Sequence, residues 1–127
     1  MPLRFPKIKI ALSEGGVGWV AMLLDRMDYM TQHELGSIGS HWDGDITPSE
    51  GLQRNFWFCT IDDPSTIGTT ERIGEDHVML EVDYPHASTT WPDTQEFVRR
   101  SMGHLPDRVI QKVTHQNAEK LFRHPLV

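Results

Sequence analysis

Apolar and polar positions follow two different periods along the chain, and the change of period separates predicted strands from predicted helices. Residues 7–12 (KIKIAL) place Ile8, Ile10 and Leu12 on one face with lysines between them, as in a β-strand. Residues 17–30 instead carry an apolar residue at about every third or fourth position, which predicts an amphipathic helix. Residues 55–60 (NFWFCT) are almost continuously apolar, as expected for a strand buried on both faces.

The rest of the chain continues this alternation of strand and helix. Four further elements are predicted: a helix at residues 62–74, a strand at 77–83, and helices at 91–103 and 105–122. In the first of these, Asp63 is expected as the N-cap, Pro64 in the first turn and Gly74 at the stop. The segment 31–54 is rich in Gly and Ser and reads as an insertion on the first crossover. Within it, Thr47 and Glu50 have capping-box spacing, which predicts one short helix.

Strands that alternate with helices favour an α/β fold with parallel strands and right-handed crossovers. Composition agrees with one domain, because the 127 residues are 38% apolar and 24% charged. No apolar run is long enough for a membrane span, and the start of the chain lacks the features of a signal peptide. The single cysteine, Cys59, lies in the apolar second strand and is expected to be a core residue; it suits a reducing compartment, so we expect a cytoplasmic protein.

The net charge of −6 is unevenly distributed. From residue 98 onward six Lys and Arg residues stand against two acidic residues, a net charge of +4, so the rest of the chain carries −10. Basic residues at helical spacing are typical of a solvated outer face, whereas a nucleic-acid surface would normally bring interleaved aromatic residues and a stronger excess of positive charge. We therefore expect neither nucleic acid nor a membrane as a partner.

Acidic residues follow each of the three predicted strands. Asp83 ends the third strand, Glu14 follows the first, and Asp62 and Asp63 follow the second. Parallel strands bring their carboxyl ends to one rim, where catalytic and metal-binding groups gather in α/β folds. His86 lies three residues beyond Asp83, and carboxylate with imidazole is a usual donor set for divalent metals. Taken singly, each acid could equally be a turn former or a helix cap.

Several longer motifs resemble one known family. They are FPKIKIALSEGGVGW, NFWFCTIDDPS, IGEDHVMLEVDYPH, WPDT and VTHQNAEKLFRHP, and they cover nearly the whole chain. In this order and spacing they are similar to the amidohydrolase-related family, the metal-dependent hydrolases and decarboxylases related to aminocarboxymuconate-semialdehyde decarboxylase. The resemblance implies the C-terminal portion of a TIM-type (β/α)8 barrel, about three βα units, with residues 1–127 forming a single partial domain that holds strands six to eight.

The resemblance also implies roles for particular residues. Asp83 matches the family's eighth-strand aspartate, a catalytic residue and metal ligand, and the metal is a divalent ion, most often zinc. Glu14 stands where many members carry a histidine, so it is a second candidate catalytic residue in acid or base chemistry. His86 follows in the rim loop and is expected to contact a small-molecule substrate. Val82 stands where a small residue is more usual.

The family's other metal ligands, an H-x-H pair and a fifth-strand histidine, have no counterpart in this sequence. A catalytic zinc normally has about three protein ligands, so the site of this chain by itself is expected to be incomplete. Two interpretations stay open: a segment of a metal-dependent enzyme that needs a complementary N-terminal chain or self-association, or a non-catalytic remnant or interaction module. With two free sheet edges, and with the strand faces around Ile8, Phe58 and Val78 uncovered, we expect the isolated chain to associate or to be partly disordered.

Overall fold

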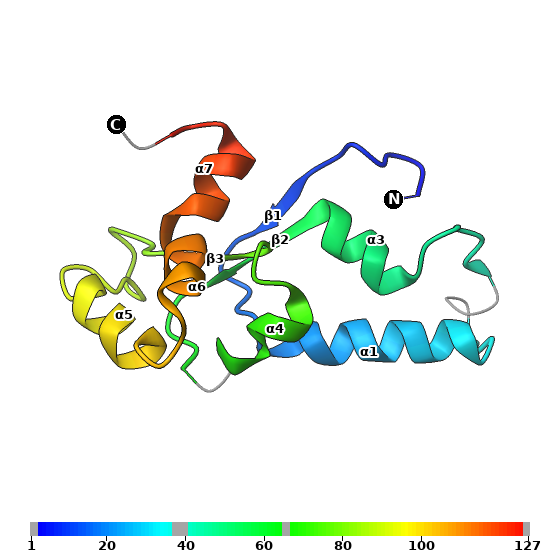
Figure 1. Ribbon diagram of the computed structural model, residues 1–127, viewed down its shortest axis with the longest axis horizontal. Coiled ribbons are helices and arrows are strands. Elements are labelled where there is room, and N and C mark those ends of the chain that lie inside the picture. The colour runs from blue at the N-terminus through cyan, green and yellow to red at the C-terminus, as the bar shows by residue number, and fades with distance from the viewer. Residues whose placement is uncertain (1–2, 37–40, 65–66, 126–127) are drawn as a thin grey trace.

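A three-stranded parallel sheet forms the centre of the molecule in the computed structural model, which describes residues 3–36, 41–64 and 67–125 (Figure 1). The strands are β1 (Ile10–Leu12), β2 (Phe56–Thr60) and β3 (Val78–Leu80), in the order β1-β2-β3. Ile10 pairs with Phe56 and Phe58 pairs with Val78, so β2 is central. The chain is therefore an α/β protein, as the alternating pattern predicts, although β1 and β3 are shorter than expected.

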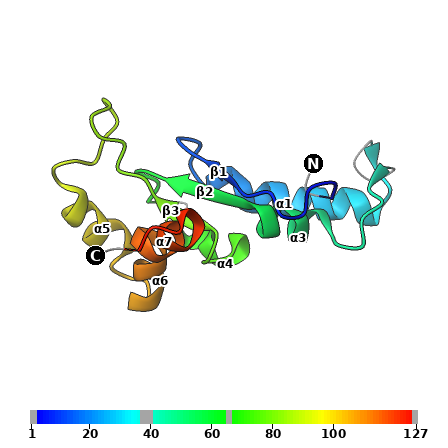
Figure 2. The same cartoon turned by 90° about the horizontal axis from the view of Figure 1, so that it is seen from above.

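Helices connect and follow the strands. They are α1 (Gly18–Gln32), α3 (Pro48–Asn55), the short turn η1 (Ile67–Thr69) with α4 (Thr70–Ile73), α5 (Thr94–Met102), and a continuous helical stretch made of α6 (Asp107–Gln111), the π-helical turn η2 (Lys112–Gln116) and α7 (Asn117–Phe122). Helices α1 and α3 lie side by side and extend to one side of the sheet, whereas α5 and α6 lie at the other (Figures 1 and 2). No helix among the described residues is long and apolar enough to cross a membrane.

The short helix predicted inside the 31–54 segment is α3, and its start is capped as expected. The Thr47 hydroxyl accepts the Glu50 backbone N–H at 3.2 Å, and the Glu50 carboxylate accepts the Thr47 N–H at 2.7 Å. These two bonds satisfy donors that the first helical turn would otherwise leave free. In the helix predicted at residues 62–74, the described helical part begins at Ile67, whose N–H donates to the Asp63 carbonyl at 3.2 Å. Residues 65–66, on which the predicted cap by Asp63 depends, lie outside the described residues.

The main core lies on one face of the sheet. Helices α1, α4, α5 and α6 pack there over Phe58 and Val78, which are 2% and 0% exposed. The expectation that the strand faces around Phe58 and Val78 are uncovered is therefore wrong, whereas Ile8, which precedes β1, is 36% exposed. The reason is that residues alternate across a strand, and the set containing Phe58 and Val78 is the one that faces the helices of this same chain. The opposite face carries Trp57, Cys59 and Met79, a smaller cluster against α7.

Candidate active site

The first candidate residue, Glu14, lies in a tight turn directly after β1. Its backbone is left-handed, with φ 57°, and Gly16 follows with φ 62°. A side chain at Gly16 would meet the Asp63 carboxylate at 3.2 Å, so this position is restricted by both its backbone and its neighbour. Asp63 therefore packs against the β1–α1 turn and accepts a hydrogen bond from Thr60 Oγ1 at 2.8 Å.

The second candidate residue, Asp83, lies three residues beyond the end of β3 and is also left-handed, with φ 56°. The His86 N–H donates to the Asp83 carbonyl at 2.8 Å, which closes a turn. Left-handed backbone is unfavourable for residues with a side chain, and residues held in it cluster at active and ligand-binding sites as well as in turns. Two of the four non-glycine residues with this conformation in the described part of the chain are thus the predicted catalytic residues.

Two side chains, those of Ser88 and His86, lie next to the Asp83 carboxylate. Ser88 Oγ donates to Asp83 Oδ2 at 2.9 Å, and His86 Nδ1 lies 3.0 Å from the same oxygen. His86 Nδ1 is also 2.9 Å from Ser88 Oγ. The Asp83 side chain is 17% exposed and the His86 side chain 64%, so the carboxylate is held inside the loop while the imidazole faces outward. When Nδ1 carries the proton it donates to Ser88 Oγ, which in turn donates to Asp83 Oδ2, and Nε2 is left as an acceptor.

The structure brings Glu14 and Asp83 together with a third carboxylate that the sequence interpretation missed, Glu81. Each of the three offers one oxygen, and these oxygens all lie within 4.8 Å of one another. The Glu14 backbone N–H also donates to Glu81 Oε2 at 2.8 Å. A signal for Glu81 was present, because Met79, Glu81 and Asp83 share one face of a strand by period-two alternation. The acids after β2 are not part of this cluster.

Cys59 lies on the same sheet face as the carboxylates. It is 7% exposed, and burial raises the pKa of its thiol to about 11, assisted by the negative charge of Glu81 and opposed by a hydrogen bond with Ser13. The thiol is therefore protonated at neutral pH and is not a nucleophile. Cys59 is a core residue, as expected from its apolar strand.

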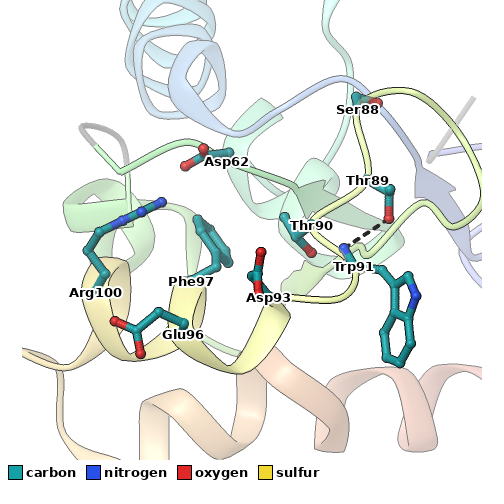
Figure 3. A pocket seen from close by; sticks show the side chains of 9 residues that line it. All are labelled: Asp62, Ser88, Thr89, Thr90, Trp91, Asp93, Glu96, Phe97 and Arg100. Carbon is teal, nitrogen blue, oxygen red and sulfur yellow. Dashed lines mark hydrogen bonds between the residues drawn. The ribbon is translucent and has the colours of Figure 1, made fainter.

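A polar pocket of about 290 Å³ lies beside the Asp83 loop (Figure 3). Asp62 lines it from the end of β2, Asp93 and Phe97 reach into it from the start of α5, and Arg100 lies at one end. Ser88 belongs both to this pocket and to the hydrogen bonds of Asp83. Asp62 thus lines a pocket that Glu14, Glu81 and Asp83 do not line.

Carboxylate oxygens are suitable ligands for a divalent metal. Three of them from Glu14, Glu81 and Asp83, within reach of one ion, fit hard cations such as Mn²⁺ or Mg²⁺, and Zn²⁺ also accepts such ligands. The donor set in the described residues therefore fits part of a metal site.

Comparisons with known proteins were made for the whole chain. A family model described as Amidohydrolase matches residues 2–124. A search of curated proteins finds no match. Among solved structures, 5-carboxyvanillate decarboxylase LigW from Sphingomonas paucimobilis is 29% identical with a TM-score of 0.74, and the match covers 94% of this chain and 35% of that one.

Two further structures are similar in fold. An amidohydrolase from Mycobacterium avium subsp. paratuberculosis K-10 is 23% identical with a TM-score of 0.76, covering 94% of this chain and 29% of its own. A dihydroxybenzoic acid decarboxylase from Polaromonas sp. JS666, solved with manganese and the inhibitor 2-nitroresorcinol, is 18% identical with a TM-score of 0.71. That match covers 94% of this chain and 35% of the decarboxylase chain. The chain therefore spans about a third of the length of the structures it matches.

Proposed function

Because the chain belongs to the amidohydrolase family, we propose that it supplies strands six to eight of a TIM-type (β/α)8 barrel and part of a metal-dependent active site. Residues 1–127 form one partial domain in this proposal. The observation that carries it is the meeting of the Glu14, Glu81 and Asp83 carboxylates at the C-terminal end of a parallel sheet. This is the end at which barrel enzymes place their chemistry.

The reaction we propose is hydrolysis or decarboxylation of a small carboxylated or cyclic substrate. Decarboxylation has the stronger support, since the structure that is 29% identical is a 5-carboxyvanillate decarboxylase. A divalent ion, zinc or manganese, would bind at Asp83 and supply a Lewis acid there. The remaining ligands would come from strands outside this sequence.

The residues of this chain would then orient groups and transfer protons. Ser88 donates to Asp83 Oδ2 and is itself hydrogen-bonded to His86, which fixes the direction of the carboxylate. In decarboxylation the bond to the leaving CO₂ breaks, its electron pair stays on the substrate carbon, and that carbon must take a proton. Glu14 is the exposed carboxyl group of the cluster and is the proposed donor; in hydrolysis it would accept a proton from water instead. His86, which faces outward, would contact the substrate.

The test is to co-express the chain with the first five strands of a related barrel. Bound Mn²⁺ or Zn²⁺ and CO₂ release from 5-carboxyvanillate or another carboxylated aromatic acid are then measured. Asp83→Ala should abolish turnover and weaken metal binding, and Glu14→Gln should lower the rate much more than the stability. Asp62→Ala is the matched control, because Asp62 is an acid at the same sheet end that lines the neighbouring pocket.

Two results would contradict the proposal in different ways. Normal turnover by Asp83→Ala with its metal retained would remove Asp83 from the mechanism. An assembled, folded barrel that neither binds metal nor turns over substrate would favour the alternative of a non-catalytic remnant or interaction module. The 127-residue chain alone is expected to be inactive and to associate, with itself or with a complementary chain, through the open edges of β1 and β3.

A further inference from the structure

We infer that Glu81 is a positioning residue, whose carboxylate holds the turn that presents Glu14. The inference rests on the proposed function for what Glu14 does once it is in place, but the geometry of the turn stands by itself. The feature behind it is a single long-range contact: the backbone N–H of Glu14 donates to Glu81 Oε2 at 2.8 Å across 67 residues of sequence.

The Glu14 turn needs such a contact because its backbone is unfavourable. A left-handed conformation at a glutamate is disfavoured by roughly tenfold relative to the ordinary helical region. Glu14 is also exposed, so apolar packing does little to hold it. A charged acceptor on a backbone N–H forms one of the stronger hydrogen bonds in proteins and offsets this preference.

Glu81 is itself held in a fixed place. It follows β3 by one residue and shares a face with Met79, which pairs with Cys59. Its negative charge contributes to the raised pKa of the buried Cys59 thiol, in agreement with a carboxylate that lies over this sheet face. Glu81 thus connects the third strand to the turn after the first, and this connection distinguishes it from a residue that serves only as a metal ligand.

Two substitutions of similar length separate these roles. Glu81→Gln keeps an oxygen that can accept the Glu14 N–H but removes the charge, whereas Glu81→Met removes the acceptor. Residue-resolved hydrogen exchange by mass spectrometry on the full 127-residue chain measures the Glu14 amide directly. Glu50→Ala is the control, since Glu50 accepts the Thr47 N–H in the same way at the start of α3.

In the Met variant the Glu14 amide should exchange at least about tenfold faster, because a hydrogen bond to a charged acceptor is lost. The Gln variant should change it by less than about threefold, and Glu50→Ala should affect Thr47 but not Glu14. The Phe58 amide, which donates to the His77 carbonyl at 2.8 Å, reports whether the sheet is intact. If the Phe58 amide also exchanges faster in the Met variant, the sheet is disturbed, and Glu81→Ala is measured instead.

The inference would be overturned if the Glu14 amide exchanged at the wild-type rate in the variants that lack an acceptor at residue 81. Equal acceleration in the Gln and Met variants, with Phe58 still protected, would also overturn it, because charge and not the hydrogen bond would then matter. Failure of the proposed function looks different. Mn²⁺ binding to the assembled barrel would be the same with and without Asp83→Ala, while the exchange result at Glu14 would be unaffected.

Discussion

The left-handed backbone at Asp83 predicts an unusual order of stability for two substitutions. At an ordinary exposed helical position, alanine is more stabilising than glycine by about 1 kcal/mol. At Asp83, where φ is 56°, alanine would keep the unfavourable contact between Cβ and the backbone, whereas glycine adopts this conformation without strain. Asp83→Gly should therefore be more stable than Asp83→Ala.

The difference in unfolding free energy between the two variants follows from two opposing contributions. Left-handed backbone costs alanine about 1–2 kcal/mol, and the greater freedom of glycine in the unfolded chain costs about 0.4–1 kcal/mol. The net difference is about 1 kcal/mol in favour of glycine. Both variants lose the hydrogen bond from Ser88, which is worth about 0.5–1.5 kcal/mol. Because the strain is already present in the wild-type chain, Asp83→Ala is expected to lose about 0.5–1.5 kcal/mol, and Asp83→Gly to be near neutral.

Urea unfolding followed by tryptophan fluorescence measures the difference, with Gln95→Gly and Gln95→Ala as the matched control pair. Gln95 is an exposed residue of α5, so at this position the alanine variant should be more stable than the glycine variant. The two pairs should therefore have opposite signs and differ by about 2 kcal/mol. The comparison requires that the variants have the same m-value, the slope of the unfolding free energy against urea concentration. If Asp83→Ala were the more stable variant, the left-handed turn and the reasoning built on it would be wrong.

Two further predictions concern buried polar groups. Since the pKa of Cys59 is raised to about 11, the protonated thiol contributes fully to the free energy of unfolding below pH 9. About 1–3 kcal/mol of that free energy should be lost as the pH rises from 9 to 11. Urea unfolding at pH 8 and 10.5 should show this loss, and Cys59→Ala should lack it. Asn117 is 3% exposed and donates at 2.8 Å to the carbonyls of Glu75 and Val78. Asn117→Ala leaves both unpaired and should cost about 2–4 kcal/mol in the same assay, so a loss below about 1 kcal/mol would contradict these contacts.

Local patterns in the sequence were enough to predict the order of the elements and much of their detail. The apolar stripe of residues 17–30 is the buried side of α1, where Val17, Val20 and Leu24 are 0% exposed. The capping box of Thr47 and Glu50 forms as its spacing predicts. Such features involve residues within one or two helical turns, so short-range geometry is sufficient to specify them.

Tertiary structure decided which face of the sheet is covered and which acids come together. The period of two shows that Phe58 and Thr60 share a face, but only the packing of α1, α4, α5 and α6 determines that this face is the main core. Likewise, Glu14 and Asp83 could be expected at one rim from the order of the strands. That Glu81 joins them depends on the pairing of strands far apart in the chain and on two left-handed turns. The alternation of Met79, Glu81 and Asp83 indicates a shared face, but the distance from Glu81 to Glu14 is set only once the strands are in register.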